Sequence, residues 1–145
     1  MDKIISVKNL KTYFYANNRC NKALNGVSMD IKRGKTLCIV GESGCGKSVT
    51  ASSIMQLLPK FSREEGEIIY HDENGRDIKI HELERNSKEM RQLRGKDIAM
   101  IFQDPMTALN PVYTIGWQIV EMIRTHEKIS KKEAKERALK LLKDM

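Results

Sequence analysis

The chain has 145 residues, 31% of them charged, and a formal net charge of +7. These values are ordinary for one globular domain with a hydrophobic core and exclude a fibrous or disordered chain. No apolar run approaches the ~18 residues of a membrane-spanning helix. The N-terminus also lacks the layout of a signal peptide, so a cytoplasmic protein is expected. Lysines alternate with acids and aromatic residues are few, which favours solvated helix faces over a nucleic-acid partner.

Alternating apolar and polar residues predict strands in the first half of the chain. Residues 5–8 and 27–31 each have one polar face, which favours antiparallel pairing, and Asn17-Asn18 marks a loop between them. Residues 66–70 and 77–80 predict a further hairpin, because Asn-Gly stands between them.

The stretch GESGCGKS at residues 41–48 fits the phosphate-binding pattern G-x-x-x-x-G-K-[ST]. Its glycines allow the backbone to turn so that successive N–H groups point at a phosphate. The apolar run 36–40 predicts a buried strand before the loop, with Cys38 in the core, and residues 49–58 predict a helix after it. The pattern predicts a nucleotide site; the alternative is a glycine-rich turn that binds nothing.

Further elements are predicted in the second half of the chain. Residues 97–102 are apolar enough for a second buried strand, and residues 82–94 suit a short surface helix or a loop. Residues 115–123 have helical spacing. Ser130 and Glu133 form the capping box of a last helix.

Three separate segments of the chain carry a resemblance to a known family, which covers nearly the whole chain. Residues 98–113, IAMIFQDPMTALNPVY, resemble the glutamine-loop segment of ABC transporter ATPases. That segment and GESGCGKSVT at 41–50 are similar to the branch that powers oligopeptide, dipeptide and nickel importers, with Cys45 in place of a serine. The opening VKNLKTYF, followed by KALNGVSMDIKRGKTL, matches the N-terminal antiparallel strands of that family.

The resemblance implies an α/β fold in three regions. These are an N-terminal antiparallel β-subdomain, a P-loop NTPase core with a partial parallel sheet and helices, and the start of the ABC helical subdomain. Within the one ABC ATPase domain 1–145, the β-subdomain takes about 1–35 and 65–80, the core 36–58 and 97–103, and the glutamine loop with the start of the helical subdomain 104–145.

The resemblance also implies a site for ATP and Mg²⁺. Phe14 would stack on adenine, with Tyr13 as the alternative. Lys47 would contact the β- and γ-phosphates, Ser48 would bind Mg²⁺, and Gln103 would approach Mg²⁺ and the attacking water. Lys47 and Gln103 are therefore the expected catalytic residues. Besides Phe14, the expected nucleotide-binding residues are Gly41, Glu42, Ser43, Gly44, Cys45, Gly46, Lys47, Ser48 and Val49.

The resemblance further implies the ATP-binding, energy-coupling subunit of an importer for peptides or similar small solutes. Such a subunit lies on the inner face of the cell membrane. Its partners are permease subunits, a second ATP-binding subunit and, indirectly, a solute-binding protein, and no nucleic acid is expected. The alternatives are a non-transport ABC ATPase that acts in translation or DNA repair, and a non-catalytic nucleotide-binding fragment.

Three motifs of the family do not occur in the sequence: the LSGG-type signature, the acidic pair of Walker B and the switch histidine that follows it. We therefore interpret the chain as the N-terminal portion of a subunit. The parent subunit would hydrolyse ATP. These residues alone would bind nucleotide weakly and would hydrolyse it at a rate at or near background. Residues 38–40 and 98–102 would expose apolar surface, and the chain would be marginally stable or self-associating alone.

Overall fold

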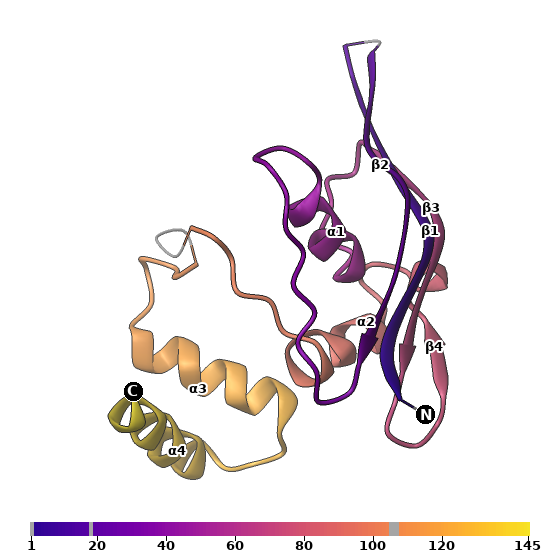
Figure 1. Ribbon diagram of the computed structural model, residues 1–145. Coiled ribbons are helices and arrows are strands. Elements are labelled where there is room, and N and C mark those ends of the chain that lie inside the picture. Colours follow the sequence, from indigo (N-terminus) through magenta and orange to yellow (C-terminus); the bar gives the residue numbers. More distant parts are fainter. Residues whose placement is uncertain (1, 18, 105–107) are drawn as a thin grey trace. The chain divides into compact units, whose positions relative to one another are not determined.

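The computed structural model describes residues 2–17, 19–104 and 108–145, so Asn18 of the predicted loop lies outside the described residues. The chain divides into two units, Met1–Arg91 and Gln92–Met145. The first unit holds a four-stranded sheet and the helix that follows the phosphate-binding pattern, and the second holds two long helices (Figure 1). Among the described residues, no helix is long and apolar enough to cross a membrane.

The sheet of the first unit has the strand order β2-β1-β3-β4, and all of its neighbouring strands are antiparallel. The strands are β1 (Lys3–Ala16), β2 (Arg19–Lys32), β3 (Ser62–His71) and β4 (Asp77–Lys79). The predicted antiparallel pairing of the first two strands and the predicted hairpin around Asn-Gly are both confirmed. β1 and β2 are longer than predicted, because the outer part of their hairpin lacks the alternation that marks a half-buried strand: residues 13–16 of β1 are aromatic or apolar, and residues 19–22 of β2 are mostly polar.

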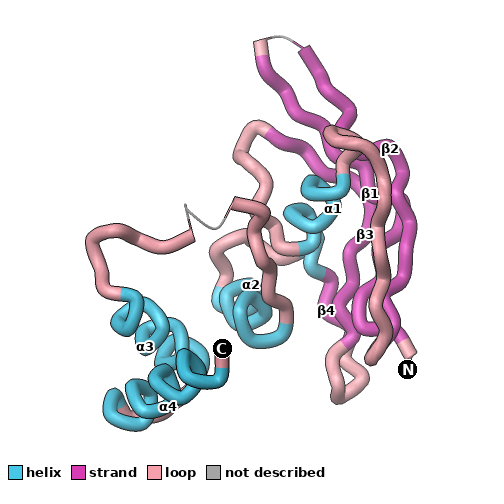
Figure 2. Tube along the Cα trace, turned by 60° about the vertical axis from the view of Figure 1, so that its left-hand side comes forward, coloured by secondary structure: helices cyan, strands magenta, loops and turns pink. Residues whose placement is uncertain are grey.

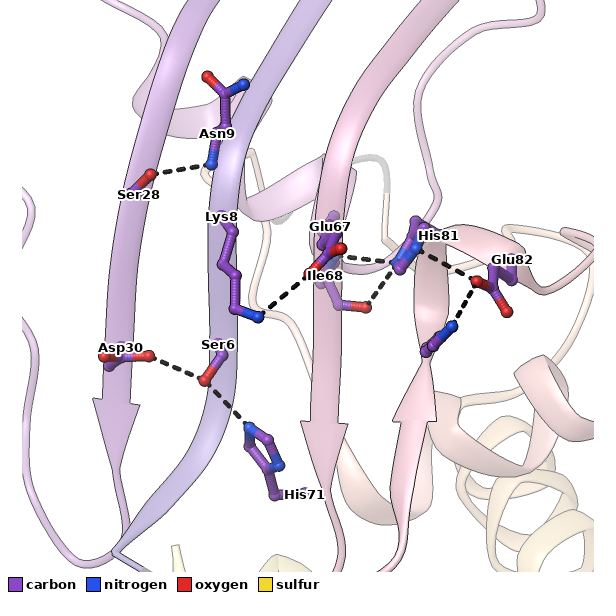
Figure 3. A network of polar contacts seen from close by, with 11 residues as sticks. Ser6, Lys8, Asn9, Ser28, Asp30, Glu67, Ile68, His71, His81 and Glu82 are labelled. Atoms are coloured by element: carbon purple, nitrogen blue, oxygen red, sulfur yellow. Dashed lines mark hydrogen bonds and ion pairs between the residues drawn. The ribbon is translucent and has the colours of Figure 1, made fainter.

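Cross-strand polar contacts accompany this register (Figure 3). Ser6 Oγ on β1 donates to Asp30 Oδ1 on β2 at 2.8 Å and lies 3.0 Å from His71 Nε2 on β3. Hydrogen bonds from Lys3 and then Ser6 hold the pKa of the Asp30 carboxyl below its usual range. The three strands are thus joined near the end of the sheet away from the β1–β2 hairpin tip.

Helix α1 (Lys47–Ile54) covers one face of the sheet (Figure 2). Thr12 of β1 and Ser53 of α1 are both almost fully buried, and their hydroxyl oxygens lie 3.4 Å apart. The helix was predicted to reach residue 58, but it ends at Ile54. The chain turns at Gln56 (φ 50°), whose side-chain amide donates to the Leu83 carbonyl at 2.9 Å. This tertiary contact outweighs the helical spacing of the sequence.

The two buried strands predicted at 36–40 and 97–102 are not formed. Apart from a single bridge between Arg94 and Ile98, no described segment pairs with either of them, and the only sheet of the described residues is antiparallel. Val40 is 86% exposed, and the prediction that Cys38 packs in the core is wrong because it too is exposed. A parallel strand needs hydrogen-bonded neighbours and covered faces, and neither is available here. The exposure matches the expectation that these apolar segments lie uncovered.

The remaining elements include the predicted helices. A 3-10 turn, η1 (Ile80–Glu82), precedes α2 (Lys88–Gln92), and a wide turn, η2 (Leu93–Asp97), follows it. The second unit then forms α3 (Ile115–His126) and α4 (Lys131–Asp144), which confirms the helical spacing of the sequence.

The predicted capping box begins α4. Ser130 Oγ accepts a hydrogen bond from Glu133 N at 3.2 Å, and Glu133 Oε2 accepts one from Ser130 N at 3.0 Å. The bonds from the Ser130 backbone and then its hydroxyl lower the pKa of Glu133 below the ordinary value of 4.5. Both hydrogen bonds are typical of a helix N-terminus and fix where α4 starts.

We expect the start of α4 to respond to acid. Because the folded pKa of Glu133 is lowered, its capping contribution is fully present above pH 4.5 and is lost as the pH falls through the lowered value. The Ser130 amide proton resonance should therefore shift with a midpoint below pH 4.5. In a Glu133→Gln variant, which keeps the hydrogen-bonding amide oxygen but cannot titrate, that shift should vanish. A midpoint at or above 4.5 in the unmodified chain would contradict the prediction.

Candidate nucleotide-binding site

The phosphate-binding pattern forms a loop that leads directly into α1 (Figure 1). Cys45 N donates to Glu42 O at 3.4 Å within the loop, and Gly46 is the residue that caps the helix. The predicted helix after the loop is therefore present, whereas the predicted strand before it is not. The first turn of α1 lies wholly within the described residues and holds no acidic side chain, so the positive end of the helix is not neutralised there.

Gly46 holds the loop against the sheet. Its φ of 97° lies in the left-handed region, and a Cβ at this position would lie 2.7 Å from Leu24 Cδ2 and 2.9 Å from the Ala23 carbonyl oxygen. Only glycine allows both this conformation and this close approach to β2. The start of α1 is thereby fixed beside the middle of the β1–β2 hairpin.

The side chain of Lys47 extends back to the start of the loop. Its Nζ donates to the carbonyl oxygens of Gly41 at 2.8 Å and of Glu42 at 2.6 Å, and it lies 3.6 Å from Cys45 Sγ. The ammonium group thus holds together the two carbonyls with which the pattern begins. A phosphate oxygen is a stronger partner for an ammonium than a peptide carbonyl, so these bonds can be exchanged for bonds to an anion.

The donor set of the loop suits a magnesium-bound polyphosphate. The ammonium of Lys47 and the N–H groups at the start of α1 supply positive charge and hydrogen-bond donors. The exposed Ser48 offers a hydroxyl of the kind that the phosphate-binding loop uses for Mg²⁺. The residues present therefore fit the two groups that the sequence predicted, ATP and Mg²⁺.

Phe14 lies on the same unit as the loop. The pairing of β1 with β3 is regular from Lys11 to Phe14, so side chains alternate there: Phe14 shares a face with Thr12, which contacts α1, and Tyr13 lies on the opposite face. Thr12 pairs with Leu24, the residue that contacts the loop at Gly46. Of the two aromatics left open by the sequence, the geometry favours Phe14, and its stacking on adenine stays a prediction.

Gln103 lies in the second unit and is exposed. Its role at Mg²⁺ stays a prediction, as do the roles of the individual loop residues. Part of the segment after it, residues 105–107, lies outside the described residues.

One aromatic next to the candidate site was missed from the sequence. Phe61, just before β3, lies with its ring centroid 6.1 Å from that of Phe14, and the two rings are tilted by 58°. No spacing rule marks this residue, since it follows α1 in a turn and meets Phe14 only through the pairing of β1 with β3.

A family model described as ABC transporter matches residues 24–145. The chain belongs to the ABC transporter family. The chain is 48% identical over 144 residues to a probable peptide ABC transporter ATP-binding protein of Sinorhizobium fredii and 47% identical over 144 residues to a dipeptide transport ATP-binding protein of Bacillus subtilis. Each match covers 98% of this ABC protein and 41% of the relative, so the chain spans about two fifths of the length of these relatives.

Solved structures of ABC cassettes give the same result for the fold. The dimeric structure of a bacterial ABC transporter cassette superposes with a TM-score of 0.79 and 27% identity, covering 97% of this chain and 56% of the other. A post-hydrolysis state of the same cassette, bound to ADP and Pi, gives a TM-score of 0.73 at 25% identity. These matches confirm the ABC ATPase fold class.

Proposed function

We propose that this ABC protein provides the triphosphate-binding part of the ATP-binding subunit of an importer for peptides or similar small solutes. The observation that carries the proposal is the Lys47 ammonium, which joins the two carbonyls at the start of the loop beside an unneutralised helix start. Polyphosphate is the ligand that such a cradle suits best. The match to peptide and dipeptide transport ATP-binding proteins supports the choice of solute class.

The loop, Phe14 and Gln103 share the contacts with Mg-ATP in this proposal. The backbone N–H groups of residues 41–49 surround the phosphates, and Lys47 bonds to the β- and γ-phosphate oxygens. Ser48 and Gln103 supply oxygens to Mg²⁺, which neutralises part of the phosphate charge when bound. Gln103 also orients the attacking water, and Phe14 stacks on adenine.

Membership of the ABC transporter family supports the proposed partners. The subunit pairs with a second ATP-binding subunit and works with permease subunits and, indirectly, with a solute-binding protein, on the inner face of the cell membrane. The dimeric structure of the matching bacterial cassette supports the pairing. The two relatives quoted above are named for peptide and dipeptide transport, and neither favours a role in translation or DNA repair.

Binding and turnover are separate parts of the proposal. Phosphoryl transfer depends on several groups that act together, and the chain carries the phosphate loop but none of the LSGG, Walker B and switch-histidine motifs. We therefore propose that the parent subunit hydrolyses ATP, whereas these 145 residues bind Mg-ATP without appreciable turnover.

Calorimetric titration of the purified chain with Mg-ATP tests the binding part. We expect saturable binding that Mg-tripolyphosphate displaces, because the phosphates supply the main contacts. A phosphate-release assay on the same sample should stay at background. Absence of saturable binding would contradict the proposal as a whole, and turnover that disappears in a Lys47→Ala variant would contradict its second part.

A further inference from the structure

Phe61 stands at the edge of the candidate base-binding position. It is 56% exposed, although its ring lies against Phe14 with centroids 6.1 Å apart and planes tilted by 58°. Tilted aromatic pairs at this separation attract each other through the positive edge of one ring and the negative face of the other. The contact therefore favours one orientation of the Phe14 ring.

The backbone holds Phe61 independently of its side chain. Tyr15 N on β1 donates to the Phe61 carbonyl oxygen at 3.2 Å. In the turn before β3, Ser62 N and Ser62 Oγ both donate to the Pro59 carbonyl oxygen, at 3.1 and 2.7 Å. Because these bonds involve no atom of the Phe61 ring, a side-chain substitution leaves the turn intact.

The aromatic pair lies close to the phosphate loop. The paired residues Thr12 and Leu24 stand where the hairpin meets Gly46, and Phe14 follows Thr12 by two residues on the same face. Two residues of a strand span about 7 Å. The pair is thus placed beside the loop, on the side toward the hairpin tip, where a base attached to a bound triphosphate can reach it.

We propose that Phe61 is a positioning residue for nucleotide binding, which fixes the Phe14 ring with one face directed at the base. The proposal rests on the proposed function, since it presumes a triphosphate in the loop. The contact with Phe61 restricts rotation of the Phe14 ring about its side-chain bonds. Without Phe61, the Phe14 side chain loses rotational freedom only when the base stacks on it. That entropy cost then lowers the affinity for the nucleotide.

Calorimetric titrations of a Phe61→Ala variant with Mg-ATP and with Mg-tripolyphosphate separate this role from a general effect on the fold. We expect the affinity for Mg-ATP to fall about three- to tenfold, as the loss of an aromatic pair predicts, with the affinity for Mg-tripolyphosphate unchanged. Phe61→Tyr should restore ATP affinity, because the ring edge remains and the added hydroxyl reaches solvent. Tyr15→Ala is the matched control, since it removes a neighbouring, 50% exposed aromatic that alternates to the other face.

The fluorescence of etheno-ATP gives a second measure, because stacking on an aromatic ring quenches it. Quenching should be weaker in Phe61→Ala than in the unmodified chain at saturating ligand. Equal losses for the two ligands, no loss for either, or an equal loss in Tyr15→Ala would overturn the inference while leaving the proposed function in place. If the unmodified chain binds neither ligand, the proposed function fails and this inference fails with it.

Discussion

Replacement of Lys47 by alanine is expected to weaken Mg-ATP binding by about 10- to 100-fold. A hydrogen bond to a charged group contributes about 1.5–3 kcal/mol, and each 1.4 kcal/mol is about tenfold in affinity. Lys47 Nζ already donates to the carbonyl oxygens of Gly41 at 2.8 Å and Glu42 at 2.6 Å. These bonds hold the ammonium group within the loop that would receive the phosphates. Calorimetric titration with Mg-ATP measures the loss.

Lys35→Ala is the control for this variant. Lys35 is an exposed lysine of the same unit, in the segment that leads to the loop, and its removal lowers the net charge by the same amount. A general attraction between a basic protein and ATP would therefore fall equally in both variants. Similar affinities for the two variants would contradict a specific role for Lys47.

The Gly46→Ala variant is expected to lose about 3 kcal/mol of unfolding free energy, measured by urea denaturation. A non-glycine residue at φ 97° is strained, which costs about 1–3 kcal/mol. The added Cβ also lies 2.7 Å from Leu24 Cδ2 and 2.9 Å from the Ala23 carbonyl, and insertion of a methyl into a tight contact costs about 1–3 kcal/mol more. Because the carbonyl belongs to the sheet backbone, the loop must move away from β2.

Gly34→Ala separates the two causes. Gly34 also has a positive φ, 63°, but no described atom lies within 4 Å of the Cβ it would gain. This variant should lose only about 1 kcal/mol, the part that comes from the backbone conformation. Equal losses in the two variants would show that the contact with β2 does not hold the loop in place.

Local patterns predicted the elements whose partners are near in the sequence. Alternation predicted the strands within β1 and β2, Asn-Gly predicted the β3–β4 hairpin, and Ser130 with Glu133 predicted the start of α4. Each depends on contacts within the element or with the next one, so the amino-acid order carries the information directly.

The misplaced elements depend on distant partners. The apolar runs 36–40 and 97–102 have the composition of central strands, yet a parallel strand also needs hydrogen-bonded neighbours that local sequence does not specify. α1 ends early because Gln56 bonds to a carbonyl 27 positions later. In the candidate site the sequence located the loop, whereas the contact of Phe61 with Phe14 arises only from the β1–β3 pairing.

The contact between Leu24 and Gly46 joins the loop to the same strand pair that carries Phe14. The interval from the loop to that ring is therefore set by the rise of an extended backbone, which changes little with temperature or solvent. Such a rigid spacer favours ligands of one length. A nucleoside monophosphate that stacks on the ring is too short for its phosphate to reach the loop. Free pyrophosphate can bind the loop but has no base to stack on the ring.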